Sequence, residues 1–122
     1  MNERPMRFGQ RLGLKPERRD EYVRCHARIW PEIEQAIRDA GIRNYSIYCL
    51  PTGAPADRGG DELFGYYEYI GPPDEYPARM AALAAAPRMR EWWDLMEAMQ
   101  IPHPRRQPGA WWAAMDEVFH QD

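Results

Sequence analysis

The sequence lacks several features that would point to particular classes of protein. It has two cysteines, Cys25 and Cys49, which stand apart in no CxxC spacing, and with no export signal we expect both to be reduced thiols of the core. Its three histidines are far apart and in no zinc-type spacing, which argues against a structural metal site. No apolar run approaches the roughly 20 residues of a membrane span, and the polar residues 1–4 are no signal peptide. We therefore expect a cytoplasmic protein with no membrane partner.

Neither sign of charge dominates the chain. It has 16 Lys and Arg residues against 19 Asp and Glu, a formal net charge of -3, and no basic tract. This balance argues against nucleic acid as a partner. A glycine-rich phosphate loop and a Gly-x-Ser-x-Gly nucleophile elbow are also missing. With 122 residues, the sequence predicts a single domain over residues 1–122.

Large aromatic rings with a polar atom are the most unusual component of the sequence. It has 5 Trp and 7 Tyr but only 3 Phe. Disordered chains are poor in aromatic residues, so this chain is expected to fold. Because Trp and Tyr combine an apolar body with a hydrogen-bonding group, their excess indicates a pocket, an interface, or both.

Hydrophobic periodicity predicts the elements of one α+β domain. Alternating or β-rich segments predict strands over residues 6–14, 44–50, 63–70 and 111–119. Apolar residues at helical spacing predict helices over residues 16–40, 74–86 and 88–99. Pro31 should break the first helix near Trp30, and Gly41 should end it. The Pro- and Gly-rich residues 51–60 should join two strands into a hairpin, and the Pro-rich residues 101–109 should form a linker.

This element order is that of a ferredoxin-like split βαβ sandwich. We expect a four-stranded antiparallel sheet with the helices on one face. The other face, rich in Tyr and Trp, would then need a cover. Pairing two such sheets in a symmetric homodimer is the economical solution, which predicts an assembly of the dimeric α/β-barrel type.

Tyr22 and His26 are the first candidates for chemistry. They are four residues apart on a helix, so both side chains leave its apolar side and point toward the sheet. A buried imidazole prefers to be neutral, and near pH 7 it can then accept one proton and donate another. The alternative interpretation is a pair of ordinary core residues.

Two further groups of side chains could line a pocket. Trp92 and Trp93 could form a flat wall for an apolar ring face, or could serve packing alone. Among the strand residues, Glu68 lies between tyrosines, where an acid either solubilises a sheet edge or accepts hydrogen bonds in a pocket.

Several motifs together resemble those of the L-rhamnose mutarotase family. They are EY-x3-H-x3-WPE at 21–32, NYSIY at 44–48, FGYYE at 64–68, the WW pair at 92–93 and EVF at 117–119. The resemblance runs in order from about residue 6 to residue 120. It implies a ferredoxin-like homodimer that interconverts the α and β anomers of a deoxy-hexose with no metal or cofactor. It also implies that Tyr22 and His26 are the active-site pair and that Trp92 and Trp93 contact the sugar.

Mutarotation suits these residue types. Opening a cyclic hemiacetal removes a proton from the anomeric hydroxyl and delivers one to the ring oxygen, so acid–base groups suffice. We expect His26 to be the principal acid/base and Tyr22 its partner; the sequence leaves open which is acid and which is base.

The polar contacts and the substrate are the remaining expectations. The sugar hydroxyls would bind Tyr48, Tyr66 or Glu68. L-Rhamnose is the expected substrate, and L-fucose or another deoxy-sugar is the alternative. Two other functions fit the fold, a cofactor-free monooxygenase and a non-catalytic sugar-binding module. Loop 51–61, Trp111 and Trp112 receive no role.

Overall fold

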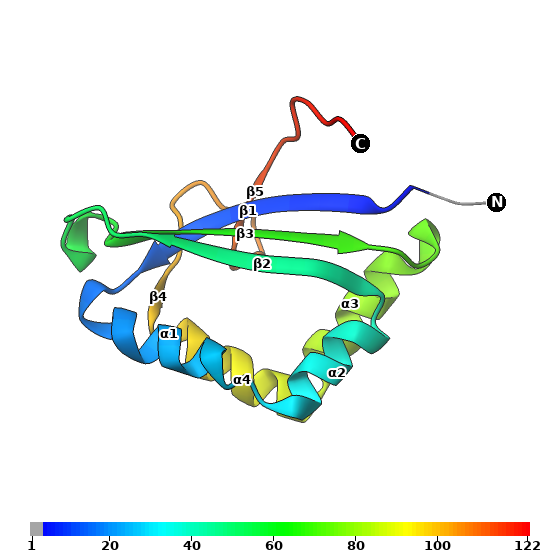
Figure 1. Ribbon diagram of the computed structural model, residues 1–122, viewed down its shortest axis with the longest axis horizontal. Helices are drawn as coiled ribbons and strands as arrows, with labels where there is room; N and C mark the ends of the chain where they lie inside the picture. Colours follow the sequence, from blue (N-terminus) through cyan, green and yellow to red (C-terminus); the bar gives the residue numbers. More distant parts are fainter. Residues whose placement is uncertain (1–3) are drawn as a thin grey trace.

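One antiparallel sheet organises the protein, which a computed structural model describes for residues 4–122 (Figure 1). Its strands are β1 (Met6–Leu14), β2 (Ile42–Leu50), β3 (Asp61–Tyr69), β4 (Gln100–Ile101) and β5 (Ala113–Met115). The spatial order is β2-β3-β1-β4, and β5 also pairs with β1. This is the ferredoxin-like order that the sequence predicts.

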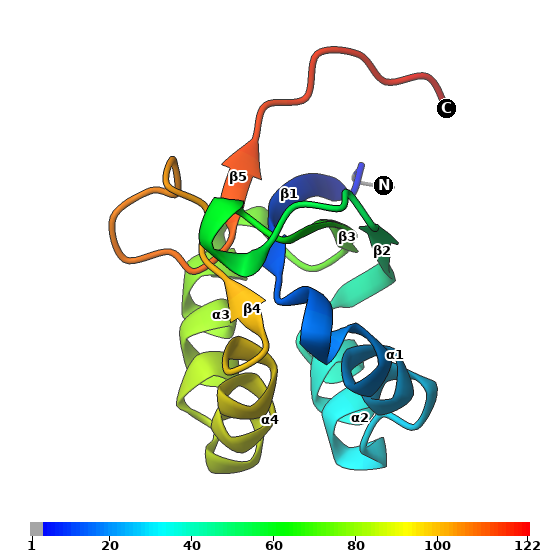
Figure 2. The ribbon, with the colours of Figure 1, turned by 90° about the vertical axis from the view of Figure 1, so that its left-hand side faces the viewer.

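Four helices cover one face of the sheet (Figures 1 and 2). They are α1 (Arg19–Ala27), α2 (Pro31–Asp39), α3 (Tyr76–Ala85) and α4 (Pro87–Glu97), with short 3-10 turns at Pro16–Arg18, Ala56–Arg58 and Pro73–Glu75. Trp30 is extended and Pro31 opens α2, so the predicted break is confirmed. Gly41 follows α2 at φ 93°, a backbone conformation that favours glycine. Within residues 4–122, no helix is long and apolar enough to cross a membrane.

The hydrophobic core lies between the sheet and the helices. Its fully buried members include Leu12, Leu14, Ile33, Leu63, Met89 and Met99. These residues come from β1, β3, α2, α4 and the turn between α4 and β4. The core therefore fixes the helices against the sheet. The burial on one face follows the alternation that predicted the strands.

The fourth strand position is filled by two short strands, which corrects the predicted strand over 111–119. β4 pairs with Gly13 and Leu14 of β1, whereas β5 pairs with residues 9–11. Residues 102–112 leave this edge after β4 and return at β5. Beyond Met115 the chain has no regular structure and runs over the sheet face away from the helices (Figures 1 and 2).

An irregularity in β2 decides which of its side chains face the helices. The register against β3 shifts between Arg43 and Ser46, and Asn44 there has φ 52°. Such a bulge reverses the alternation along the rest of the strand. Tyr45 therefore shares the helix-covered side with Tyr67, and Tyr48 lies on the other side.

The two cysteines are free thiols. Cys25 is half-buried, but Cys49 is exposed, contrary to the expectation of a core position. The reason is its place in β2, which lies at the edge of the sheet.

Candidate active site

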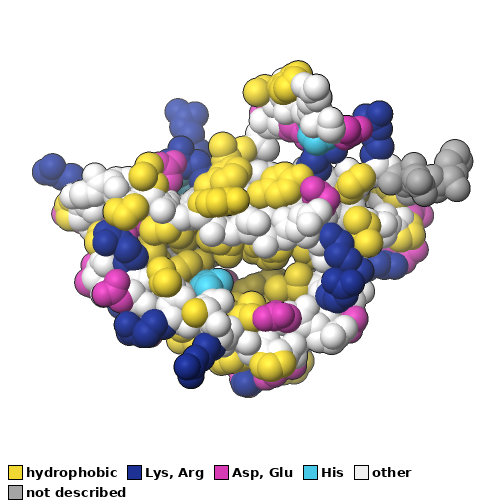
Figure 3. Space-filling view, viewed as in Figure 1, with side chains coloured by type: hydrophobic (Ala, Val, Ile, Leu, Met, Phe, Trp, Pro, Cys, Tyr) yellow, Lys and Arg dark blue, Asp and Glu magenta, His cyan; other side chains and the backbone are white. Residues whose placement is uncertain are grey.

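A cavity of about 1210 Å³ lies between the helix-covered face of the sheet and the helices. The space-filling view shows this hollow beneath the sheet, with hydrophobic side chains around it and a histidine at its margin (Figure 3). Its lining comes from strands, helices and the 102–112 segment. All four of Tyr22, His26, Trp92 and Trp93 belong to it.

Helix α1 presents Tyr22 and His26 side by side in this cavity. Their ring centroids are 4.4 Å apart. His26 Nδ1 is 2.9 Å from the carbonyl oxygen of Tyr22. A carbonyl can only accept, so Nδ1 carries the hydrogen and Nε2 carries the lone pair. Burial lowers the pKa of His26 below its ordinary value, with an opposing effect from this hydrogen bond. The imidazole is therefore neutral near pH 7, with a basic nitrogen at Nε2.

The Tyr22 hydroxyl contacts a buried polar pair that the sequence analysis missed. Gln100 Nε2 donates to Tyr22 Oη at 3.0 Å, and Trp111 Nε1 donates to Gln100 Oε1 at 2.8 Å. Tyr22 is 4% exposed and Gln100 is 5% exposed. Burial raises the pKa of Tyr22 well above its ordinary value, so the phenol stays protonated. A signal was present, because Gln100 is a polar residue between the apolar Met99 and Ile101.

The tryptophan pair from α4 forms an aromatic wall. Trp92 is 4% exposed, and its ring meets His26 edge-on at 5.7 Å and Trp30 at 5.0 Å between centroids. Trp93 is half-buried, and the Arg90 guanidinium lies 5.6 Å from its ring centroid. Trp92 thus also packs in the core, whereas Trp93 offers more ring surface to the cavity.

Tyr45 and Tyr67 extend the aromatic lining on the sheet side. Their ring centroids are 5.5 Å apart, and the Tyr67 and Tyr76 hydroxyls are 2.6 Å apart. Burial raises the pKa of Tyr45 to about 12, although 38% of the residue is exposed. The sequence analysis did not select Tyr45, because regular alternation gives no sign of the bulge at Asn44.

Tyr48, Tyr66 and Glu68 lie on the other face of the sheet, away from this cavity. Tyr48 is 64% exposed, and its ring faces Phe64 at 6.4 Å. Because Leu63, Gly65, Tyr67 and Tyr69 face the helices, the residues between them point away. The structure thus does not bring these three predicted sugar contacts together with Tyr22 and His26.

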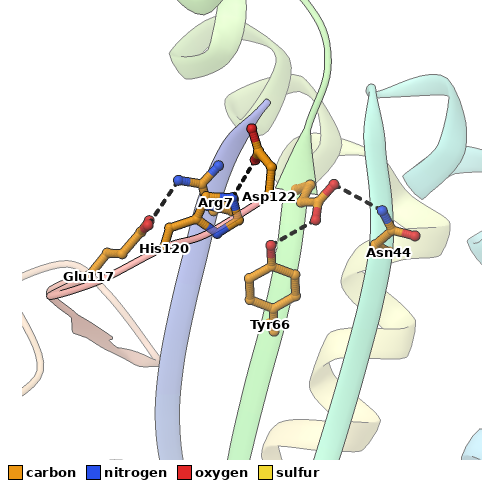
Figure 4. A network of polar contacts seen from close by, with 7 residues as sticks. Arg7, Asn44, Tyr66, Glu117, His120 and Asp122 are labelled. Carbon is orange, nitrogen blue, oxygen red and sulfur yellow. Dashed lines mark hydrogen bonds and ion pairs between the residues drawn. The ribbon is translucent and has the colours of Figure 1, made fainter. Parts of the chain in front are cut away.

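Tyr66 and Glu68 instead belong to a polar network on the outer face (Figure 4). Glu68 accepts from Tyr66 Oη at 2.7 Å and from Asn44 Nδ2 at 2.9 Å. Nearby, Arg7 pairs with Glu117 of the C-terminal segment at 2.8 Å. The Arg7–Glu117 pair joins the C-terminal segment to β1, and none of these residues lines the cavity.

The cavity offers phenol, imidazole, amide and indole groups. Within residues 4–122, no group of three or more His, Cys, Asp or Glu side chains is arranged to hold a metal ion. Proton exchange and hydrogen bonding are the chemistry that this lining can supply.

Known proteins are similar to this chain in sequence and in fold. The family model described as L-rhamnose mutarotase matches residues 7–121. An L-rhamnose mutarotase from Opitutus terrae is 36% identical over 102 residues, covering 84% of this chain and 85% of the relative. One from Ligilactobacillus salivarius is 32% identical over 120 residues, covering 96% and 98%. The crystal structure of an L-rhamnose mutarotase from Formosa agariphila superposes with a TM-score of 0.66 at 23% identity, covering 96% of this chain and 99% of the other.

The family model and these relatives define an enzyme of the carbohydrate isomerase class. More particularly, the chain belongs to the L-rhamnose mutarotase family, as the motifs in its sequence indicate.

Proposed function

We propose that this protein interconverts the α and β anomers of L-rhamnose by acid–base ring opening and closure, without a cofactor. The observation that carries the proposal is the pairing of Tyr22 and His26 on one side of α1, with rings 4.4 Å apart in a cavity. The names of the relatives supply the substrate. The reaction already proceeds slowly in water, so a gain of about 10²–10⁴-fold per positioned group is enough to be useful.

His26 is the base in this mechanism. Its Nδ1 hydrogen is engaged by the Tyr22 carbonyl, which leaves the Nε2 lone pair for the substrate. Nε2 takes the proton of the anomeric hydroxyl, and the electron pair of that O–H bond forms the carbonyl of the open-chain aldehyde. The bond between the anomeric carbon and the ring oxygen breaks, and its electron pair goes to the ring oxygen.

Tyr22 is the acid. Its raised pKa keeps the hydrogen on the phenol until the ring oxygen develops charge, and the phenol then delivers that proton. The aldehyde turns about its bond to the next carbon. Closure on the opposite face reverses both transfers, returning one proton to Tyr22 and placing the other on the new anomeric oxygen. Both groups end as they began, which is why the scheme consumes no co-reactant.

Trp92 and Trp93 are the proposed wall for the apolar side of the sugar. A 6-deoxy sugar has a methyl group where other hexoses have a hydroxymethyl group, and a ring face of indole suits that edge. The sugar hydroxyls would be served by groups that line the same cavity, such as Gln10 and Tyr45. Tyr48, Tyr66 and Glu68 do not line the cavity. We therefore assign the binding of the sugar hydroxyls to Gln10 and Tyr45 instead.

We further propose a homodimer in which the helix-free sheet faces pair. Exposed large hydrophobic side chains gather on that face and its C-terminal segment, namely Tyr48, Leu50, Phe64, Met115, Val118 and Phe119. Such surfaces mark contact sites. Light scattering at micromolar concentration should report a dimer that Leu50→Glu weakens and Val23→Glu, on α1, does not. A stable wild-type monomer would contradict this assembly. The cytoplasmic location and the absence of a nucleic-acid partner stay predictions.

Saturation-transfer NMR on L-rhamnose tests the activity, with L-fucose measured alongside. The wild type should accelerate exchange between the anomers of L-rhamnose over buffer, and Tyr22→Phe and His26→Ala should each lower it by about 10²-fold or more. Tyr69→Phe is the matched control, because Tyr69 is a buried tyrosine whose hydroxyl donates to the Pro72 carbonyl at 2.8 Å outside the cavity. Binding without acceleration would indicate a sugar-binding module, and unchanged rates in both active-site variants would refute the residue assignment.

A further inference from the structure

We propose that Trp111 and Gln100 are positioning residues that set the direction of the Tyr22 hydroxyl, so that its hydrogen is offered to the sugar. The inference deepens the proposed function and rests on it. Tyr22 touches the reacting atoms in that scheme, whereas Gln100 and Trp111 act through Tyr22. Each of the three residues lines the same cavity.

Trp111 sets the orientation of the Gln100 amide. An indole nitrogen carries a hydrogen and can only donate. The atom of Gln100 that lies 2.8 Å from Trp111 Nε1 is therefore the oxygen. This fixes an amide whose oxygen and nitrogen could otherwise be exchanged, and it turns Nε2 toward Tyr22.

Gln100 in turn sets the role of the Tyr22 oxygen. An amide NH₂ group only donates, so Tyr22 Oη accepts at 3.0 Å. The phenol hydrogen must then point elsewhere, and within residues 4–122 the hydroxyl makes no other hydrogen bond. Gln100 is 5% exposed, so water does not readily replace its partners, and leaving either end unpaired would be costly.

His26 and Tyr22 are thus held in complementary roles, one as a hydrogen-bond acceptor and the other as a donor. The Tyr22 carbonyl holds the hydrogen of His26 at Nδ1, which leaves an acceptor at Nε2. The Trp111–Gln100 pair occupies the acceptor side of Tyr22, which leaves a donor. One acceptor and one donor, each held by a hydrogen bond behind it, are what simultaneous deprotonation of a hydroxyl and protonation of a ring oxygen require.

Gln100→Glu tests the relay, because it should reverse the hydrogen bond to Tyr22. A carboxylate can only accept, so Tyr22 would turn its hydrogen toward residue 100 and away from the sugar. We expect a loss of about 10²-fold in kcat for anomer exchange, similar to Tyr22→Phe. When the new carboxyl is protonated it can again donate to Tyr22 and accept from Trp111. The rate of this variant should therefore rise as the pH falls, until His26 takes up a proton.

That recovery at lower pH is a readout that a merely structural role would not produce. Burial raises the pKa of an introduced carboxyl and lowers that of His26, and both shifts favour the state in which the carboxyl is protonated and His26 is neutral. Gln107→Glu is the matched control: Gln107 is exposed, and its Oε1 also accepts an N–H, from Ala114 at 3.2 Å. It should keep the rate and the pH profile of the wild type. A Gln100→Glu enzyme with the wild-type profile would overturn the relay.

Trp111→Phe provides the second test if Gln100→Glu fails to fold. It keeps an aromatic ring but removes the N–H, so the amide is free to turn over. We expect kcat to fall by about 3- to 10-fold, the effect of one net hydrogen bond, with no new rise at low pH. An unchanged kcat would count against the relay.

The indole N–H resonance of Trp111 separates failure of the relay from failure of the proposed function. It is assigned by its absence in Trp111→Phe and needs no turnover. In Gln100→Glu it should shift and should titrate with the introduced carboxyl. A wild type that does not accelerate anomer exchange would refute the proposed function, whereas an unmoved resonance would refute the relay even in an active enzyme.

Discussion

Removing either partner of the Arg19–Asp61 pair should destabilise the protein by different amounts. Asp61 begins β3 and its side chain is 0% exposed, whereas the Arg19 side chain at the start of α1 is 37% exposed. Two hydrogen bonds join them, at 2.6 and 3.0 Å. Arg19→Ala would leave a buried carboxylate without its partner, which costs about 3–5 kcal/mol. Asp61→Ala would leave a guanidinium that can turn into water, so we expect a loss of about 1–2 kcal/mol.

Urea unfolding followed by tryptophan fluorescence measures the two losses. The double variant should be more stable than Arg19→Ala alone, because it removes the unpaired buried charge. Asp94→Ala serves as the control: its pair with Arg90 spans 2.9 Å but is 67% exposed at the carboxylate, so its loss should stay below about 1 kcal/mol. Equal losses for the two single variants at Arg19 and Asp61 would refute the argument from burial. Arg19 lies three residues before Tyr22, so the pair also anchors the turn of α1 that carries the proposed acid.

Two further predictions concern pH and the loop that precedes β3. Since the pKa of folded His26 lies below 6.5, the exchange rate should hold near pH 7 and fall only as the pH drops below that lowered value, which a pH–rate profile checks. Stability should begin to decline at a higher pH than the rate, from about pH 6.5 down to the folded pKa, because the unfolded state takes up the proton that the folded state resists. Gly13→Ala should cost about 1–3 kcal/mol in urea unfolding, because its Cβ would meet the Gly59 carbonyl. Gly9→Ala, whose Cβ would meet Phe64 at an ordinary 3.6 Å, should cost less; equal costs would contradict the steric argument.

Local patterns predicted most of the fold because the elements depend on local physics. The alternation over residues 6–14 matches β1, whose two buried residues, Leu12 and Leu14, lie on one face with the half-buried Gly13 between them. Pro31 ends one helix and begins the next for the steric reason known from the sequence alone. The prediction of a strand over 111–119 was wrong in its length, because strand pairing depends on β1, which is distant in the sequence.

The register of β5 continues to Glu117, beyond the end of its backbone pairing. Met115 lies opposite Gly9, so a longer strand would place Glu117 opposite Arg7. Those two side chains do meet, at 2.8 Å, although the strand ends at Met115. At Glu117, therefore, the register of β5 is kept by an ion pair to β1 rather than by backbone pairing.

The site was predictable where helical spacing decides it and not where strand parity does. Tyr22 and His26 are neighbours on any helix, and Trp92 and Trp93 are adjacent residues of α4. The structure brings all four to one cavity. Tyr48 was expected there as a polar partner for the sugar hydroxyls, but the letters of the strand do not show which face it takes. One bulge at Asn44 exchanges the faces, and it admits Tyr45 to the cavity in place of Tyr48.

The break between β4 and β5 along β1 gives a role to Trp111, which the sequence motifs left without one. In a continuous fourth strand, every residue would pair with β1, and no side chain could fold back onto an earlier residue of the same strand. Here β4 stops at Ile101 and β5 starts at Ala113, so residues 102–112 can swing out and return with Trp111 against Gln100. Gln100 lies in β4 and Trp111 two residues before β5, so the break in the strand is what allows the indole to reach back to the amide. Shortening the 102–112 segment to make one regular strand would therefore remove the proposed control of Tyr22 while leaving Tyr22 and His26 in place.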